Sequence, residues 1–222
     1  MIHIQHFVFN DFMENTYVLW DESNECVIID PGCNTPAEKS DMVQFIRGNE
    51  LKPVLLVNTH CHIDHVLGNK WVKETYQVDL LIHQQELVVL QTMEEISKMY
   101  GIYAETSPAP DRYLAAGERV TFGKSSMHVL FTPGHSPGSI SLYAAEDKVV
   151  ISGDVLFRSG IGRTDLPGGS YQVLMNSICQ ELLLLPDETR VYSGHGPVTT
   201  IGEERRHNPF ILEYAADANM HL

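Results

Sequence analysis

The stretch Thr59-His60-Cys61-His62-Ile63-Asp64-His65 brings three histidines and one aspartate together within seven residues. It follows the apolar run 53–58, which is typical of a fully buried strand, and it precedes the run 66–72, which is typical of the start of a helix. We therefore expect the cluster at the carboxyl end of a strand, where open α/β sheets keep their ligand sites. Imidazole and carboxylate groups together suit zinc, iron or manganese. The stretch predicts a metal site, and the alternative is a polar turn whose histidines face water.

Three later fragments share one design, in which an apolar strand ends in a polar residue beside a glycine. They close with Gly134-His135, Gly153-Asp154 and Gly194-His195. Glycine at such a position permits a tight turn and a close approach of the backbone to a site, although each fragment alone also fits an ordinary capped turn. Together with the first cluster they supply seven candidate ligands, a number that suits two metal ions sharing a bridging group. The candidates are His60, His62, Asp64, His65, His135, Asp154 and His195.

Periodicity along the chain predicts alternating strands and helices. We expect strands at 2–9, 15–20, 26–29, 53–58, 78–82, 120–123, 127–131, 139–143, 148–152 and 189–193. We expect helices at 36–47, 66–75, 85–100 and 170–185, a further helix from residue 200, and a linker at 100–111 that belongs to a lid or a pocket rim. Thr35 and Glu38 are expected to form a capping box at the first helix. This order predicts two mixed β-sheets packed together with helices outside, in one compact domain over residues 1–222.

Composition narrows the class of partner. The apolar fraction of 43% and the charged fraction of 20% are ordinary for a soluble globular protein. A formal charge of -14 argues against binding to nucleic acid or to an anionic membrane. The N-terminus lacks the pattern of a signal peptide and the four cysteines lack paired spacing, so we expect a cytoplasmic protein with reduced thiols. We interpret Cys61, inside the first cluster, as a spacer that points away from the metal.

On these motifs the sequence resembles the metallo-β-lactamase superfamily, whose members carry THxHxDH, then a His, a bridging Asp and a last His in that order. The resemblance implies an αββα sandwich with the site at the edge between the two sheets. It implies one metal on His60, His62 and His135, a second on Asp64, His65 and His195, and Asp154 between them. Two divalent ions per chain are expected, zinc first, with iron or manganese as alternatives. Asp30 is similar to a residue that supports the ligands from behind, and the alternative is a plain strand-end turn.

Within the superfamily, the runs 153–157, 162–165 and 194–197 resemble the hydroxyacylglutathione hydrolase (glyoxalase II) group, most closely its short bacterial branch. The resemblance implies that a metal-bridging hydroxide attacks the carbonyl of a thioester, with Asp64 and Asp154 as the catalytic carboxylates. Arg163 is the candidate contact for an acidic substrate, or else a salt-bridge partner. Longer relatives carry an extra C-terminal helical domain that binds glutathione. Only a short segment follows His195, so we expect a chain without that domain and a thioester not tied to glutathione.

Other activities stay open at this point. A mononuclear iron persulfide dioxygenase of the same superfamily shares the Gly-Arg-Thr-Asp element. The run 134–138 matches the G-x-S-x-G elbow of serine hydrolases, with Asp154 and His195 following in the required order. That elbow needs a helix after the serine, whereas the sequence predicts a strand there. A non-catalytic metal-binding module is the alternative outside enzymes. The oligomeric state is left open.

Overall fold

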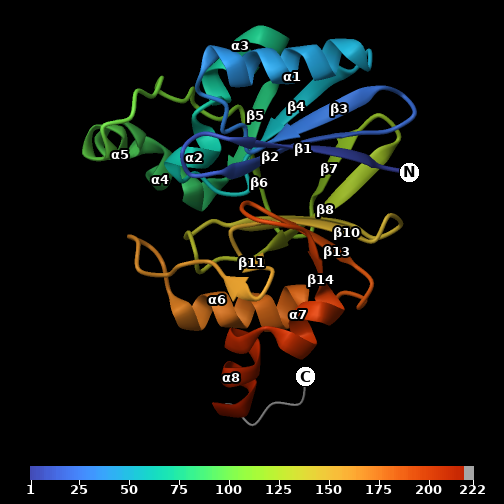
Figure 1. The fold of residues 1–222 in the computed structure, drawn as a ribbon, viewed down its shortest axis with the longest axis vertical. Coiled ribbons are helices and arrows are strands. Elements are labelled where there is room, and N and C mark those ends of the chain that lie inside the picture. Colours follow the sequence, from blue (N-terminus) through green and yellow to red (C-terminus); the bar gives the residue numbers. More distant parts are fainter. Residues whose placement is uncertain (218–222) are drawn as a thin grey trace.

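The computed structural model describes residues 1–217 of the chain. Two six-stranded sheets lie face to face, and helices cover both outer faces (Figure 1). The first sheet has the order β1-β2-β3-β4-β5-β6, and the second has the order β14-β13-β10-β9-β8-β7. Each sheet contains parallel and antiparallel pairs. The predicted four-layer αββα sandwich of two mixed sheets is therefore confirmed.

The first sheet is built from the N-terminal half of the chain. Its strands are β1 (His3–Phe9), β2 (Glu14–Trp20), β3 (Glu25–Ile29), β4 (Lys52–Val57), β5 (Asp79–His83) and β6 (Arg112–Leu114). Helices α1 (Pro36–Gly48) and α3 (Asn69–Tyr76) cover its outer face (Figure 1). The predicted capping box opens α1, since the Thr35 hydroxyl accepts from the Glu38 amide and the Glu38 carboxylate accepts from the Thr35 amide. This reciprocal pair satisfies two of the free amides at the helix start.

The second sheet and its helices come from the C-terminal half. Its strands are β7 (Arg119–Phe122), β8 (Ser125–Phe131), β9 (Ile140–Ala144), β10 (Val149–Gly153), β13 (Arg190–Ser193) and β14 (Thr199–Thr200). A small hairpin of β11 (Leu156–Phe157) and β12 (Gly160–Ile161) follows β10. The outer face is covered by α6 (Tyr171–Ser177), the π-helical turn η2 (Ile178–Leu182) and α7 (Ile201–His207), while α8 (Pro209–Asp217) packs against α7 and projects away from the sheet (Figure 1). Ser170 is the N-cap of α6, and its side chain accepts from the Val173 amide.

Strands in both sheets are buried on both faces. Apolar side chains therefore form three layers, one between the sheets and one between each sheet and its helices. In β3, Val27 and Ile29 point between the sheets while Ile28 packs toward α1. In β10, Ile151 points between the sheets while Val150 packs toward α6. Each fully buried aliphatic side chain of this kind contributes about 1.5–3 kcal/mol. The continuous apolar runs in the sequence are thus explained by burial on two faces.

The structure corrects several predicted boundaries. The predicted helix 66–75 is instead two helices, because α2 (Ile63–Val66) already forms within the ligand stretch and is separated from α3 at Gly68. A side chain at Gly68 would lie 2.7 Å from the Pro31 carbonyl oxygen, so the close approach of the two backbone segments requires glycine here. The predicted helix 85–100 is instead the 3-10 turn η1 (Gln84–Glu86) followed by α4 (Leu87–Gln91) and α5 (Met93–Tyr100). Pro209 divides the predicted terminal helix, because the residue before a proline is pushed out of the helical region.

The linker predicted at 100–111 has no regular structure over 102–110. Strand β6 follows it, and this strand was not predicted; neither were the β11–β12 hairpin and β14. Within residues 1–217, no helix is both long and apolar enough to cross a lipid bilayer.

The carboxyl ends of five strands meet at one edge of the sandwich. The two sheets are joined there by backbone hydrogen bonds, from the Ile140 amide to the Thr59 carbonyl at 2.9 Å and from the Asn15 amide to the Gly194 carbonyl at 2.7 Å. The segments after β3, β4, β8, β10 and β13 therefore converge, and they carry all the candidate ligands.

Candidate metal centre

The seven candidate ligands lie together at this edge, and six of them form two groups of three. The ligand atoms of His60, His62 and His135 all lie within 4.8 Å of one another. Those of Asp64, His65 and His195 form a second group within the same distance. Asp64 and His65 stand in the first turn of α2, so this short helix turns both side chains into the site. Each group has the size and donor atoms to hold one divalent ion.

The carboxylate of Asp154 lies between the two groups. Its Oδ2 is 3.6 Å from His135 Nε2 and 3.5 Å from His195 Nε2, and its Oδ1 is 3.5 Å from His65 Nε2. One carboxylate thus faces a member of the first group and two members of the second. This is the position that a bridging ligand requires.

The unsatisfied polar atoms of the site test whether a metal fits. Among the described residues, His60 Nε2, His65 Nε2 and Asp154 Oδ1 are buried and have no hydrogen-bond partner. A buried polar atom without a partner costs about 1–3 kcal/mol, so such atoms seldom cluster without a reason. Coordination of a cation would satisfy all three. The side chains present therefore fit divalent metal ions.

Hydrogen bonds on the far side of three rings fix which nitrogen can bind a metal. His135 Nδ1 lies 2.8 Å from the Arg163 carbonyl, His195 Nδ1 lies 3.2 Å from the Met13 carbonyl, and His65 Nδ1 lies 3.2 Å from Asp30 Oδ2. These partners only accept, so we assign the proton to Nδ1 in each ring. In His65 and His135 the Nε2 lone pair then points into the site, as metal ligation requires. His195 Nε2 also faces the site, where it lies 3.1 Å from Asp64 Oδ2.

Asp30 supports the centre from behind the ligands. Its Oδ1 accepts from the Thr59 amide at 2.7 Å and its Oδ2 accepts from the Thr59 hydroxyl at 2.5 Å. The Thr59 hydroxyl in turn lies 3.2 Å from His60 Nδ1. Asp30 thus contacts His65 directly and reaches His60 through Thr59. A plain strand-end turn would not make these contacts.

The electrostatic environment favours the charge states that a cation needs at His60, His62 and Asp154. Burial, with the neighbouring His65, holds the pKa of His60 well below its ordinary value, and burial with His135 lowers the pKa of His62 to about 4. Both rings are therefore neutral near pH 7. Burial alone would raise the pKa of Asp154, but the neighbouring histidines outweigh it and hold that pKa below its ordinary value. Asp154 is therefore an anion. At His65 and His195, burial lowers the pKa, but the carboxylates of Asp64 and Asp154 outweigh burial and raise the pKa above its ordinary value.

Two buried glutamates at the site were missed by the sequence reasoning. Glu14 opens β2, with Oε1 3.8 Å from His65 Nδ1 and Oε2 accepting from the Thr16 hydroxyl at 2.8 Å. Burial raises its pKa well above the ordinary value. Glu86 closes η1 and is also fully buried. In the sequence, each of these glutamates is a single acid with one polar and one apolar neighbour. Half-exposed helices and strands show the same pattern, so the sequence does not mark either residue as part of a site.

Cys61 and Arg163 lie outside the two ligand groups. Cys61 is buried, belongs to none of the metal-binding groups found within residues 1–217, and has a pKa raised well above its ordinary value by burial. Arg163 is exposed and forms a two-pronged ion pair with Asp165, with both N–O distances at 2.7 Å. The salt-bridge alternative is thus present in the structure, and the substrate contact stays a prediction.

The serine-hydrolase alternative does not fit the geometry. Ser136 is completely buried and its hydroxyl donates to Glu86 rather than to a histidine. The predicted strand β9, and not a helix, follows the turn. A nucleophile elbow needs an exposed hydroxyl on a strand-to-helix turn.

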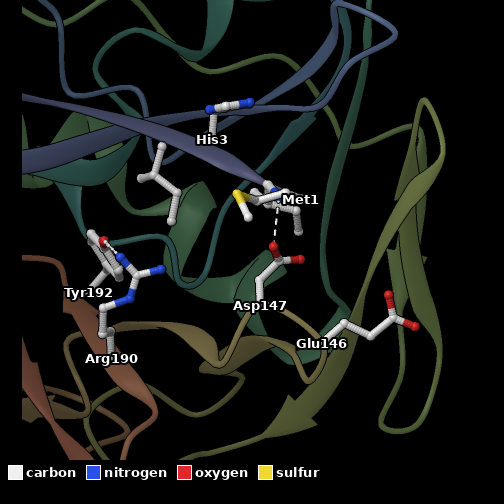
Figure 2. Close-up of a pocket in the computed structure, with 8 residues that line it drawn as sticks. Met1, His3, Glu146, Asp147, Arg190 and Tyr192 are labelled. Atoms are coloured by element: carbon white, nitrogen blue, oxygen red, sulfur yellow. Dashed lines mark hydrogen bonds between the residues drawn. The ribbon is translucent and has the colours of Figure 1, made fainter.

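The cavity of about 380 Å³ between the sheets is separate from the metal centre. Met1, Asp147, Arg190 and Tyr192 line it (Figure 2). Arg190 begins β13 and Asp147 precedes β10, whereas the candidate ligands follow the carboxyl ends of these strands. The cavity therefore lies at the opposite end of the second sheet and contains none of the ligands.

A four-layer αββα sandwich with a His/Asp cluster at the sheet edge defines a class of metal-dependent proteins. The chain belongs to the Metallo-beta-lactamase superfamily, whose family model matches residues 9–195. The sequence resemblance is therefore confirmed, and the family together with the curated relatives supports a metal-dependent hydrolase. One relative is the probable metallo-hydrolase YqgX of Bacillus subtilis (strain 168), 39% identical over 89% of this chain and 92% of its own length. Another is the hydroxyacylglutathione hydrolase GloC of Haemophilus influenzae, 36% identical over 90% of this chain and 93% of its own length.

Solved structures share the fold over nearly the whole chain. BLEG-1, a B3 metallo-beta-lactamase, is 36% identical with a TM-score of 0.86, covering 94% of this chain and 99% of its own. TTHA1623 in a di-iron-bound form is 37% identical with a TM-score of 0.83, and the match covers 93% of this chain and 99% of TTHA1623. ETHE1 from Myxococcus xanthus is 26% identical with a TM-score of 0.77, covering 99% and 92%.

Proposed function

We propose that this protein hydrolyses a small acidic thioester with the help of two divalent metal ions. The observation that carries the proposal is the position of Asp154 between two groups of three ligands, with buried unpartnered atoms on both sides of it. The relation to GloC, a hydroxyacylglutathione hydrolase, supports a thioester as the substrate class.

The ligand groups suggest how the ions would be held. His60, His62 and His135 would hold one ion, and Asp64, His65 and His195 would hold the other. Asp154 would contact both. We propose zinc as the native metal because four-coordinate His/Asp sites suit it, with iron as the alternative in view of the di-iron-bound relative.

The chain's own residues would divide the work of hydrolysis. A bound pair of divalent ions supplies a water of lowered pKa and polarises the substrate carbonyl. Asp64, partly open to solvent and 3.1 Å from His195 Nε2, would accept a hydrogen bond from the attacking water and fix its direction. The hydrogen bonds behind His65, His135 and His195 hold these rings in place, so little reorganisation is needed during the reaction.

Charge and chemistry both favour the thioester. A thiolate is a good leaving group, so the site needs no strong acid to protonate it. The exposed Arg163 guanidinium lies on the segment whose carbonyl holds His135, so it can meet a carboxylate of the substrate at the mouth of the site. The formal charge of -14 supports a small-molecule substrate over a nucleic acid.

The test is a substrate panel on the metal-loaded protein. We expect turnover of hydroxyacyl thioesters, loss of turnover with a chelator, and recovery with zinc. The Asp154→Ala variant should lose bound metal and turnover together. Full retention of both by Asp154→Ala would contradict the proposal. So would faster turnover of a β-lactam, or oxygen consumption with a persulfide in place of thioester hydrolysis.

A further inference from the structure

A buried carboxylate outside the ligand set links the two loops that carry the histidine group. Glu86 is the last residue of η1, which directly follows β5 of the first sheet, and it is completely buried. It contacts no candidate ligand side chain by hydrogen bond. Its contacts are instead to backbone and hydroxyl groups beside those ligands.

Three donors converge on this carboxylate. Glu86 Oε2 accepts from the Cys61 amide at 2.7 Å, and Cys61 lies between His60 and His62. Glu86 Oε1 accepts from the Ser136 hydroxyl at 2.5 Å and from the Gly138 amide at 2.6 Å. The first donor belongs to the loop after β4 in the first sheet. The other two belong to the loop between β8 and β9 in the second sheet, which carries His135.

We propose that Glu86 is a positioning residue that sets the distance between these two loops, and with it the geometry of the His60–His62–His135 group. The proposal rests on the metal centre proposed above. Two ligands of this group come from one sheet and the third comes from the other. A tie between the loops therefore controls how well three nitrogens meet one ion.

The contacts require a carboxylate rather than any side chain of that size. All three partners donate, and only an ionised carboxylate offers acceptors to all of them. A glutamine at this position would turn its NH₂ group toward a backbone amide in either orientation. Burial raises the pKa of Glu86, and the three hydrogen bonds oppose that shift. A side chain on Gly138 would lie 2.8 Å from the Glu86 amide, so glycine is needed for this close approach.

Asp21 provides a matched control at the opposite end of the sandwich. It is also buried, and it also ties the first sheet to the second. Its carboxylate accepts from the amide of Lys124, in the β7–β8 turn, at 2.7 Å and from the hydroxyl of Ser125, the first residue of β8, at 2.8 Å. Loss of this tie should loosen the sandwich without touching the metal centre.

The test measures zinc affinity by chelator competition on metal-stripped protein, together with the cobalt absorption spectrum of each variant. We expect Glu86→Gln to weaken binding about tenfold to a hundredfold and to alter the cobalt spectrum. Asp21→Asn should lower the thermal midpoint and leave affinity and spectrum unchanged. Equal affinity in Glu86→Gln and the wild type would overturn the inference, and so would an equal loss of affinity in Asp21→Asn.

A milder variant covers the case in which Glu86→Gln does not fold. Ser136→Ala removes one of the three donors and leaves the carboxylate with both backbone amides. We expect a smaller but measurable loss of zinc affinity in this variant, and unchanged affinity would overturn the inference. A folded wild type that binds no zinc would contradict the metal centre itself. That result is distinct from failure of the Glu86 tie alone, in which the wild type and the variants bind metal equally well.

Discussion

The carboxylate of Asp30 lies behind the ring of His65, with Oδ2 3.2 Å from Nδ1. The same oxygen accepts from the Thr59 hydroxyl. One buried acid therefore fixes the tautomer of one candidate ligand and, through Thr59, orients His60. Its backbone has a φ of 48°, the left-handed region that aspartate and asparagine tolerate better than most residues.

Asp30→Asn tests this support without disturbing the backbone. The amide keeps the size and the left-handed φ but removes the charge and one acceptor. We expect zinc affinity to fall about tenfold to a hundredfold, because partners behind metal ligands contribute on that scale. Affinity is measured by chelator competition and folding by circular dichroism. A folded variant with wild-type affinity would show that Asp30 is only a turn residue.

Two glycines near the last ligand should respond differently to alanine. A methyl group at Gly194 would lie 2.1 Å from Asp154 Oδ1 and 2.6 Å from His65 Cε1, so it would enter the centre. We expect Gly194→Ala to lose bound metal and turnover. Gly196 has a φ of 75° and open space around it, so Gly196→Ala should cost about 1–2 kcal/mol of stability through backbone strain and keep its metal. Metal content and denaturant unfolding separate the two effects, and equal metal loss in both would contradict this reading.

Asp21 should make stability depend on pH. Burial raises its pKa, but hydrogen bonds from Ser23, Ser125 and Lys124 outweigh burial and hold the pKa below its ordinary value. A depressed folded pKa stabilises the fold above the unfolded pKa of about 4 and loses that effect as the pH falls toward the folded value. We expect Asp21→Asn to lower the free energy of unfolding by about 2 kcal/mol at pH 7 and by less at pH 3. Urea unfolding of metal-stripped protein at both pH values is the measurement. An equal difference at both would refute the assignment.

Cys61 should behave as a packing residue. It is buried and its pKa is raised by burial, whereas Cys179 is only partly buried. We expect Cys61→Ala to keep its metal and to lose about 1 kcal/mol of stability. In the folded wild type, iodoacetamide should label Cys179 before Cys61, as read by mass spectrometry of peptides. Loss of metal in Cys61→Ala would make the thiol a ligand instead.

Variants of Arg163 and of its ion-pair partner Asp165 test whether Arg163 contacts an acidic substrate. Arg163→Ala should raise KM for an acidic thioester several-fold, with kcat and metal content unchanged, because only a contact at the mouth is lost. Asp165→Ala frees the guanidinium and should leave KM unchanged or lower it. Steady-state kinetics with a neutral thioester is the control, since neither variant should affect it. If Arg163→Ala has wild-type KM for the acidic substrate, the pair is structural only.

The sequence made most of the site predictable because the signals are local. His60 to His65 follow an apolar strand, and Asp154 and His195 each follow a strand and a glycine. Each fragment can therefore be recognised as a candidate ligand position from a few neighbouring residues. The strands themselves were recognised because burial on both faces produces continuous apolar runs. The resemblance to the superfamily then assembled these fragments into two groups.

The remaining features depend on contacts that no short window contains. Glu86 meets Ser136 across fifty positions of the sequence, so its role appears only when the sheets are stacked. The break between α2 and α3 follows from the approach of Gly68 to Pro31, a residue on another strand end. Strand β6 follows an irregular segment and pairs with β5. It is three residues long, which is too short to show a periodic pattern in the sequence.

The number of metal ions per folded chain tests the proposed centre most directly. Metal-stripped protein would be titrated with zinc while binding and thioester turnover are followed in the same samples. The position of Asp154 between the two ligand groups predicts two ions per chain, with turnover rising as they bind. Saturation at one ion, or full turnover in the metal-stripped protein, would contradict a two-metal hydrolase.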